Sequence, residues 1–371
     1  MSITIRMIQA PDYPVLEDFL YLAAFLPQIH TPPPRDALYQ PDVSVYLEDF
    51  GRVGDLGFVA VEDGEIIGAV WSRLIKAYGY VDEETPELII AVLPEHQGRG
   101  LGKSLLTHLL DLLCMRGYER VSLSVEKINP ALRLYESLGF KALREDDEEV
   151  VMLREFPPEK MNDFFDTRVG IYEHHMNVNM ELEEFYEMIA DQLRPQRPDF
   201  RLLDLGCGTG LELERLFESY PTMQVTGIDL SEGMLEKLQE KFPGKSIKLI
   251  YGSFFEVELG SGFDFVLSTY TLHHFNEHEK AGLYQRIHAA LAPDGVFVYG
   301  DFTATTLEQQ ELLAATAARK RLENKLDESE YYHLDQPLTA ENEMGLLKAA
   351  GFSDVQMAHW WEKASIIVAK K

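Results

Sequence analysis

Two glycine-rich segments have the residue types and the spacing that suit nucleotide-like ligands. The first is Gln97-Gly98-Arg99-Gly100-Leu101-Gly102, and the second is Asp204-Leu205-Gly206-Cys207-Gly208-Thr209-Gly210. Glycines let the backbone approach a ligand closely, and the free N–H groups at the start of a helix attract anions. The first segment therefore predicts a diphosphate site, and the second predicts a nucleotide site.

The first loop needs a strand before it and a helix after it. Residues 87–92 predict the strand, and an amphipathic pattern from Gly102 to about Arg116 predicts the helix. Upstream, two apolar runs flank Asp63-Gly64, which is a strong hairpin signal. The other elements expected in this half are strands at 57–62, 65–71 and 121–125 and a short helix at 130–138. Together they predict a mixed sheet with helices.

The second loop opens a region in which strands and helices alternate. Strands are expected at 201–204, 224–229, 248–251, 263–268 and 296–300. Such alternation predicts a parallel, doubly wound sheet. A helical entry segment, 161–193, should precede this sheet, and a helical cap at 307–332 should cover the acceptor pocket. Two final strands, near 355–361 and 366–369, should close the sheet edge.

The first half resembles the GNAT acetyltransferase family. Leu93 to Gly102 is similar to that family's acetyl-CoA signature, and Asn129 to Phe140 is similar to its second cofactor motif. The resemblance covers nearly all of residues 1–155 and implies a GNAT fold that binds acetyl-CoA. The positions it implies for the pantetheine arm, the pyrophosphate and the cofactor's flank are Ala91, Val92, Gln97, Gly98, Arg99, Gly100, Leu101, Gly102 and Asn129.

The resemblance also implies two catalytic groups. Tyr135 would protonate the departing coenzyme A thiolate, although a core aromatic under the helix is the alternative. Glu87 is the nearest candidate for the base, but its spacing from Ala91 would turn its side chain to the other face of the strand unless a bulge restores it. A water relay is the alternative base. The Pro32-Pro33-Pro34-Arg35 loop is expected to overhang the acceptor side.

The second loop fits two classes of protein, and its residue pattern distinguishes between them. About twenty residues after it, the next strand ends in Asp229, whose carboxylate suits ribose hydroxyls in dehydrogenases as well as in methyltransferases. The run Asp-Leu-Gly-Cys-Gly-Thr-Gly resembles the first motif of class I S-adenosylmethionine-dependent methyltransferases, whereas a dinucleotide loop would have its last glycine later. The resemblance continues through later motifs and spans about residues 162–371.

That resemblance implies S-adenosylmethionine as the cofactor and a set of residues that hold it. Ser253 departs from the family pattern, which often has an aspartate there, so adenine recognition would rest on the Phe254 amide and on stacking. The fourth strand lacks an Asn-Pro-Pro-Tyr/Phe motif, which argues against an adenine base or a glutamine amide as acceptor. The implied cofactor residues are Asp204, Gly206, Cys207, Gly208, Gly210, Asp229, Leu230, Met234, Ser253, Phe254 and Ser268.

Acceptor-side residues are expected just past the fourth strand of this half. His273 and His274 could accept a proton there, and a packing and hydrogen-bonding histidine pair is the alternative. Asp301, Tyr172 and Arg168 are further candidates for orienting the methionine part of the cofactor or the acceptor. Methyl transfer depends chiefly on alignment and on the exclusion of water, so a dedicated base is optional.

Bulk composition limits the class of partner. The 371 residues carry a formal net charge of −28, which repels nucleic-acid backbones. Two cysteines, Cys114 and Cys207, cannot form a disulfide framework or a cysteine-rich metal site, so we expect no metal and a reducing, cytoplasmic location. No segment predicts a membrane span. Small-molecule acceptors are therefore expected, and the oligomeric state is left open.

The sequence thus predicts two fused α/β domains. Residues 1–155 form a GNAT-type acetyltransferase with a mixed sheet, 156–161 form a linker, and 162–371 form a Rossmann-like, doubly wound, seven-stranded methyltransferase. The expected activity is that of a bifunctional transferase for small-molecule acceptors. The alternative is that only the methyltransferase half is catalytic and that the GNAT-like half binds a ligand or regulates.

Overall fold

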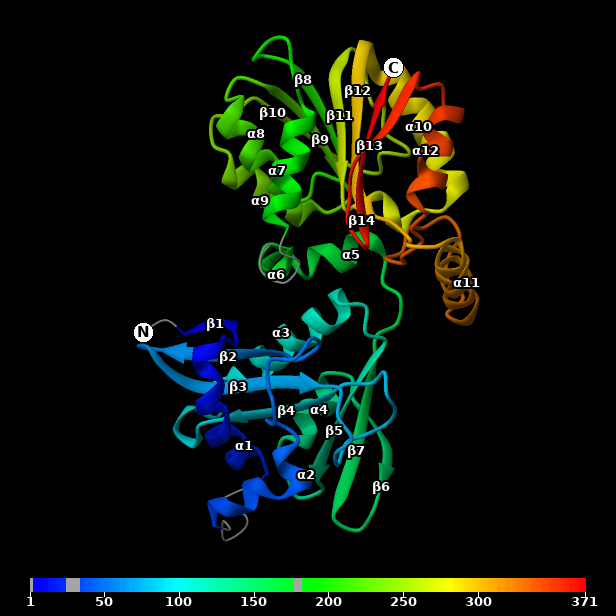
Figure 1. Ribbon diagram of the computed structural model, residues 1–371. Helices are drawn as coiled ribbons and strands as arrows, with labels where there is room; N and C mark the ends of the chain where they lie inside the picture. The colour runs from blue at the N-terminus through cyan, green and yellow to red at the C-terminus, as the bar shows by residue number, and fades with distance from the viewer. Residues whose placement is uncertain (1–2, 25–33, 177–181) are drawn as a thin grey trace. The chain divides into compact units, whose positions relative to one another are not determined.

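The computed structural model describes residues 3–24, 34–176 and 182–371. The chain divides into two compact units, Met1–Pro157 and Pro158–Lys371, and each is built on a seven-stranded sheet flanked by helices (Figure 1). The proline-rich loop that was expected to overhang the acceptor side falls mostly outside the described residues. The two sheets confirm the predicted α/β fold class.

The sheet of the first unit is mixed, with the strand order β1-β2-β3-β4-β5-β7-β6. The β2–β3 hairpin turns at Asp63-Gly64, where both residues have positive φ, the geometry of a tight hairpin turn. The strands are β1 Thr4–Met7, β2 Leu56–Glu62, β3 Glu65–Arg73, β4 Glu87–Val92, β5 Arg120–Glu126, β6 Lys141–Glu145 and β7 Glu149–Glu155. The helices are η1 Ala10–Val15, α1 Leu16–Ala24, η2 Arg35–Tyr39, α2 Pro41–Ser44, η3 Pro94–His96, α3 Leu101–Met115 and α4 Leu132–Ser137.

Strand alternation gives this sheet two apolar faces. In β2, Val59 faces a core formed with α1, whereas its neighbours Phe58 and Ala60 face a core formed with α3. A strand with both faces buried reads as a continuous apolar run, which is why this segment shows no polar alternation.

Strands β4 and β5 separate at the centre of this sheet. They run parallel but share a single pair, Glu87 with Ser122, whereas β4 pairs with β3 along its whole length. Beyond that pair the two strands diverge, and the edge of β4 that faces β5 lacks a neighbouring strand. The divergence opens the cleft described below.

The second unit has the strand order β10-β9-β8-β11-β12-β14-β13. The strands are β8 Arg201–Leu205, β9 Gln224–Asp229, β10 Ile247–Tyr251, β11 Phe263–Thr269, β12 Leu291–Phe302, β13 Asp354–Trp360 and β14 Ala364–Lys370. The helices are α5 Met161–Asp166, α6 Val169–His174, α7 Glu183–Gln192, α8 Leu211–Ser219, α9 Glu232–Lys241, η5 Leu272–His274, α10 Glu277–Ala290, α11 Leu307–Glu323 and α12 Ala340–Ala349.

The five strands predicted to be parallel are so, and the last two strands close the sheet edge as predicted. β10, β9, β8, β11 and β12 are parallel, but β14 is antiparallel to both β12 and β13. β13 and β14 are joined by a short turn, which permits only antiparallel pairing. Helices α7, α8 and α9 cover one face, α10 and α12 cover the other, and α5 lies beneath the ends of the strands (Figure 1).

The expected helical cap is shorter than predicted. α11 ends at Glu323, and Lys325 has a φ of 51°, a left-handed conformation that ends a helix. The segment that follows α11 runs back along the unit as an extended loop and forms an isolated bridge from Tyr332 to Lys160.

The segment between the units is bonded on both sides. The Phe156 amide donates to the Glu119 carbonyl of the first unit, whereas Glu159 and Lys160 form ion pairs with Arg168 and Glu330 of the second. We retain 156–161 as the proposed linker. None of the helices in the described part of the chain combines the length and the apolar character that crossing a bilayer needs.

A buried ion pair links α10 to α12 in the second unit. The Lys280 Nζ lies 3.0 Å from the Glu343 carboxylate, both side chains are fully buried, and the Tyr284 hydroxyl also contacts Glu343. Removing one member of such a pair leaves a buried charge without its partner.

Lys280→Met is therefore expected to destabilise the second unit by about 3 kcal/mol in chemical denaturation. The double variant Lys280→Met/Glu343→Leu removes both charges and should recover most of that loss. A double variant as unstable as the single one would show that packing, and not the unpaired charge, is responsible.

Candidate active sites

The first candidate site is the cleft between the diverging strands β4 and β5. The cleft spans about 2100 Å³, a volume that includes space open to solvent. The glycine loop before α3 and the helix α4 complete its walls. The structure brings most of the predicted residues of this half to the cleft. They are Glu87, Ala91, Val92, Gln97, Gly98, Gly100, Leu101, Gly102, Asn129 and Tyr135.

Backbone conformation makes the glycine loop suitable for an anion. Gly98 and Gly100 have φ values of 74° and 81°, which other residues rarely adopt. Gly100 is the N-cap of the 15-residue helix α3, and no side chain caps its first amides. Those amides and the helix dipole remain available to a phosphate.

Three side chains of this site have bonds within the unit. The Gln97 Nε2 donates to the Val92 carbonyl at 3.0 Å, and the Asn129 Oδ1 accepts from the Ala131 amide at 2.9 Å. The role predicted for Arg99 concerns its backbone amide and stays a prediction, since its side chain points elsewhere. Its guanidinium bonds Glu62 at 2.9 Å and His96 at 2.9 Å, and it is not among the residues that line the cleft.

Glu87 lies in the cleft without the bulge that was expected to be necessary. β4 pairs with β3 in an unbroken register, and the buried Glu87 Oε1 accepts bonds from the Gly79 amide at 2.8 Å and from the Tyr46 hydroxyl. Its Oε2 has no hydrogen-bond partner within the described part of the chain. Burial raises the pKa of Glu87 from 4.5 to about 7, although both hydrogen bonds oppose that shift.

The position of Tyr135 is compatible with both interpretations, so its role as an acid stays a prediction. Its ring packs edge-on against Phe140 in the core, yet the residue lines the cleft. Burial raises the pKa of Tyr135 to about 12, so the phenol holds its proton at neutral pH and can donate it.

The second candidate site lies at the carboxyl ends of β8, β9 and β11. Its pocket spans about 510 Å³, part of which is open to solvent. The predicted residues that line it are Gly206, Gly208, Asp229, Leu230, Met234, Phe254 and His274, and Tyr172 lines it too. Its remaining walls come from Met161, Phe165, Tyr270, Thr271 and Phe275.

The loop after β8 depends on glycine for two reasons. Gly206, Gly208 and Gly210 all have positive φ, at 72°, 45° and 72°. A Cβ on Gly206 would also lie 2.3 Å from a methyl carbon of Thr271. The loop is anchored to β9, since the Gly206 amide donates to the Ile228 carbonyl at 2.8 Å.

Asp229 ties the loop to the end of β9. One carboxylate oxygen accepts from the Gly208 amide at 2.8 Å, and the other accepts from the Ser231 amide at 2.9 Å. Burial raises the pKa of Asp229 to about 6, against the effect of these bonds. The group is therefore ionised at neutral pH, and it faces the pocket.

Asp204 and Glu212 form a buried acidic pair beneath the loop. Their carboxyl groups interact, burial raises the pKa of both, and neither oxygen of Asp204 has a hydrogen-bond donor among the residues that the structure describes. Two carboxylates in contact do not both ionise unless a cation compensates them. The pair is suited to a neighbouring positive charge.

Five predicted cofactor residues do not line the pocket: the buried Asp204 and four others. The Ser268 hydroxyl donates to the Leu205 carbonyl at 2.9 Å, and the Ser253 hydroxyl accepts from the Phe255 amide at 3.2 Å. The Cys207 side chain is buried in the core against β9, and Gly210 packs against Leu238 and Phe242. Their part in holding the cofactor stays a prediction, and all four residues shape the loop and the sheet beneath it.

Arg168 is corrected as well. Its guanidinium bonds Glu159 at 2.7 Å and lies 4.3 Å from the centre of the Phe164 ring, so it anchors the start of the unit and does not reach the pocket.

Asp301, at the end of β12, fixes the histidine turn η5. Its carboxylate accepts from the amides of Leu272 and His273 at 2.7 and 3.0 Å and from the His273 Nδ1 at 2.6 Å. Burial lowers the pKa of His273, but Asp301 raises it by more, so the net shift is upward. Asp301 thus orients the His273 ring and turns its Nε2 away from itself.

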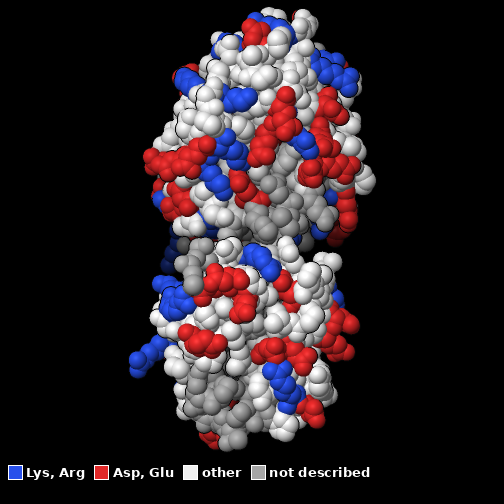
Figure 2. All heavy atoms as spheres, turned by 90° about the vertical axis from the view of Figure 1, so that its left-hand side faces the viewer, with Lys and Arg blue, Asp and Glu red and all other residues white. Residues whose placement is uncertain are grey.

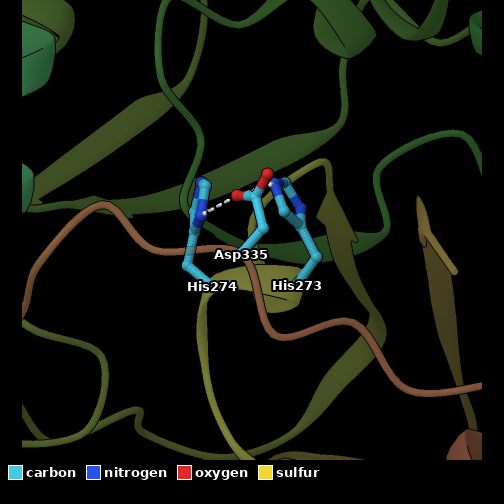
Figure 3. Close-up of side chains that lie close together, drawn as sticks. All are labelled: His273, His274 and Asp335. Atoms are coloured by element: carbon cyan, nitrogen blue, oxygen red, sulfur yellow. Dashed lines mark ion pairs between the residues drawn. The ribbon is translucent and has the colours of Figure 1, made fainter. Parts of the chain in front are cut away.

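His274 lies between the pocket and the loop after α11. Its Nδ1 is 3.1 Å from the Asp335 carboxylate (Figure 3). Its ring centre is 4.4 Å from that of His333. Burial lowers the pKa of His274. His333 in turn stacks on Phe164 at 3.6 Å.

Sequence reasoning missed several partners in both sites. Tyr46 and Glu62 lie on segments far from the motifs they support. Glu212 and Thr271 stand beside recognised motifs, but only the fold brings them to Asp204 and Gly206. Asp335 has no local signal beyond a polar stretch before Pro337.

The fold and the sites define a two-unit α/β protein with one cofactor-type cleft in each unit. The acetyltransferase (GNAT) family model matches residues 23–140, and a methyltransferase-domain model matches residues 202–295. The chain belongs to the class I methyltransferases through its second unit and carries a GNAT-family domain in its first.

Curated relatives resemble the second unit. A malonyl-[acyl-carrier protein] O-methyltransferase of Acetivibrio thermocellus is 31% identical over 127 residues, 34% of this chain and 43% of that protein. A carboxy-S-adenosyl-L-methionine synthase of Campylobacter concisus is 30% identical over 171 residues, 43% of this chain and 73% of that protein. The chain thus spans less than half the length of the first of these relatives.

Solved structures are more distant. Haemonchus contortus phosphoethanolamine N-methyltransferase 2 in complex with S-adenosyl-L-methionine is 17% identical, with a TM-score of 0.43 over 68% of this chain and 77% of that chain. Magnesium protoporphyrin IX methyltransferase from Synechocystis is 16% identical, with a TM-score of 0.42 over 57% and 97%.

The raised pKa of Glu87 makes the stability of the first unit depend on pH. The folded state keeps the proton up to about pH 7, whereas an unfolded glutamate loses it near 4.5. Stability therefore falls as pH rises through this window and levels off above it. Glu87→Gln cannot ionise, so its stability relative to the wild type should increase by about 3 kcal/mol between pH 4.5 and 8.

The measurement is chemical denaturation followed by Trp71 fluorescence in a Trp360→Phe/Trp361→Phe background. Glu83→Gln, at an exposed position, is the matched control and should show no such trend. A pH-independent difference between Glu87→Gln and the wild type would mean that Glu87 titrates normally.

Proposed function

We propose that the chain is a bifunctional transferase that uses S-adenosylmethionine in its second unit and acetyl-CoA in its first, with small molecules as acceptors. The observation that carries the methyltransferase half is the glycine loop bonded to Asp229 above the buried pair Asp204–Glu212. The acetyltransferase half is supported by the unpartnered Glu87 oxygen in the cleft between β4 and β5.

The residues of the second pocket fit S-adenosylmethionine, which supplies an activated methyl group when bound. Asp229 has the charge and the place to accept bonds from ribose hydroxyls. Leu230, Met234 and Phe254 provide apolar walls for a base. The Asp204–Glu212 pair suits the cationic amino acid part of the cofactor. The bulky walls exclude water, which methyl transfer requires.

His273 and His274 remain proposed acceptor-side residues. His274 lines the pocket, and His273 is held in one orientation by Asp301. Tyr172 is retained as a pocket residue that could orient the methionine part of the cofactor or the acceptor.

The cleft of the first unit fits acetyl-CoA, which supplies an acetyl group when bound. The amides before α3 suit the pyrophosphate, and the open edge of β4 offers backbone groups to the pantetheine arm. Glu87 is the proposed base, because its ionised form can take a proton from an amine. Tyr135 is the proposed acid.

Charge favours an amine as the acceptor in this cleft. Glu87, Glu126 and Glu149 line it, and an amine is a cation before it loses its proton. On the face drawn in Figure 2, acidic side chains cover more of the surface than basic ones do, which agrees with the net charge of −28. Nucleic acid is not a proposed partner. Cys114 and Cys207 are not joined in a disulfide, which accords with the proposed cytoplasmic location.

The methyltransferase half is tested by calorimetry with S-adenosylmethionine. Asp229→Asn loses the charge and one acceptor oxygen, so its Kd should rise at least tenfold, about 1.4 kcal/mol. Asp354→Asn, in an exposed ion pair with Lys370, is the control and should bind like the wild type. Binding of a nicotinamide dinucleotide in place of S-adenosylmethionine would overturn this half of the proposal.

The acetyltransferase half is tested with acetyl-CoA and a panel of small primary amines. The acceptor amine titrates in the same way in both assays, so its effect cancels when the kcat/KM of the wild type is divided by that of Glu87→Gln. This ratio should rise as pH increases through about 7, where Glu87 ionises, and level off at 10²-fold or more. Tyr135→Phe should lower kcat with little change in the Kd for acetyl-CoA. Acetyl-CoA binding with no transfer to any amine would favour a regulatory role for this unit.

A further inference from the structure

Three potential metal ligands converge beside the methyltransferase pocket. His273 and His274 come from the turn η5 after β11, and Asp335 comes from the loop after α11 (Figure 3). One ligand atom from each side chain lies within 4.8 Å of the others, and no other trio of histidine, cysteine or acidic side chains in the described part of the chain does so. The Asp335 carboxylate lies between the two imidazoles (Figure 3).

We propose that His273, His274 and Asp335 bind one divalent first-row transition-metal ion, with Zn²⁺ as the reference ion, at the acceptor end of the pocket. Two imidazole nitrogens and one carboxylate are a ligand set for such ions and leave further coordination positions open.

The distances suit a metal after a small contraction. The Asp335 Oδ1 is 3.1 Å from the His274 Nδ1 and 3.7 Å from the His273 Nε2. Metal–ligand bonds of about 2.0–2.1 Å bring ligand atoms to about 3–3.4 Å from one another in tetrahedral geometry. Asp335 is 44% exposed and sits on a loop, so its side chain can adjust.

His273 has the supporting bond that metal-binding histidines need. Its Nδ1 is bonded to Asp301, a fully buried carboxylate, at 2.6 Å, and its Nε2 is directed toward Asp335. A carboxylate on the far nitrogen fixes the ring orientation and increases the basicity of the nitrogen that binds the metal.

The Nδ1 of His274 is buried and lies beside the Asp335 carboxylate, the second ligand of the cluster. The His274 side chain is 4% exposed, and its Nδ1 has no bond of hydrogen-bond geometry among the described residues, although Asp335 is within ion-pair distance. A buried polar atom without a hydrogen bond costs stability unless a ligand satisfies it.

The loop that carries Asp335 is clamped to the histidine turn. The Gln336 amide donates to the His273 carbonyl at 2.7 Å, and its side-chain amide donates to the His274 carbonyl at 3.2 Å. These two hydrogen bonds therefore hold the loop that carries Asp335 next to the turn that carries the two histidines.

A metal here would act on the acceptor. Because His274 also lines the pocket, an ion on this cluster could take an acceptor oxygen or nitrogen into an open position. This part rests on the proposed methyl transfer, whereas metal binding itself does not.

The test is titration of the metal-free full-length protein with Zn²⁺ by calorimetry and with Co²⁺ by visible absorption. We expect one equivalent per chain, with Co²⁺ bands of low coordination number. Asp335→Asn and His274→Ala should each weaken binding at least tenfold. His278→Ala, an exposed histidine on the following helix, is the matched control and should bind like the wild type.

Asp335→Asn changes a half-exposed side chain, so it keeps the test valid if His274→Ala does not fold. Saturation with neither ion, or equal affinity in Asp335→Asn and the wild type, would overturn the proposal. S-adenosylmethionine binding is measured in the same samples. If the wild type does not bind S-adenosylmethionine, the proposed function is wrong. If it binds S-adenosylmethionine but no metal, only the metal site is wrong.

Discussion

The sharp turn from the end of a strand into the start of a helix is the constraint on which both sites depend. In the first unit Gly100 makes this turn with positive φ and caps α3, so that free amides face the cleft. In the second unit Gly206 makes it with positive φ and with Thr271 packed directly against its α-carbon. A side chain at either position would strain the backbone, and at Gly206 it would also collide with the wall of the pocket.

Buried carboxylates take different roles around these turns, because their neighbours differ. Glu87 keeps one free oxygen in an open cleft, where burial raises its pKa to about 7. Asp229 is bonded by two amides and stays ionised at neutral pH. Asp301 has four hydrogen-bond donors, and His273 outweighs burial, so that its pKa falls. The pKa of each group therefore reflects the balance between its burial, which raises the pKa, and the hydrogen bonds and positive charges around it, which lower it.

The acceptor side of the second unit is assembled from the most distant parts of its chain. The entry helix α5 contributes Met161 and Phe165 to the wall, η5 contributes His274, and the loop after α11 contributes Asp335 and Gln336. The sheet fixes only the strand ends, so these additions determine the shape of the space beside the cofactor loop. If these residues form the acceptor side as proposed, they can vary with the acceptor while the strands that make up the fold stay the same.

The sequence by itself determined the two glycine loops, the strands that lead into them, the hairpin at Asp63-Gly64 and the two families, because these depend on contiguous residues and local backbone conformation. It also predicted Glu87, Tyr135 and Asp229 as candidates. Tertiary structure alone decided that Glu87 faces the cleft and that Asp335 lies beside His273 and His274. It also decided that the side chains of Ser253, Ser268 and Arg168 form bonds that stabilise the surrounding structure. Those outcomes depend on strand register and on contacts across some 60 residues of chain, which no local pattern encodes.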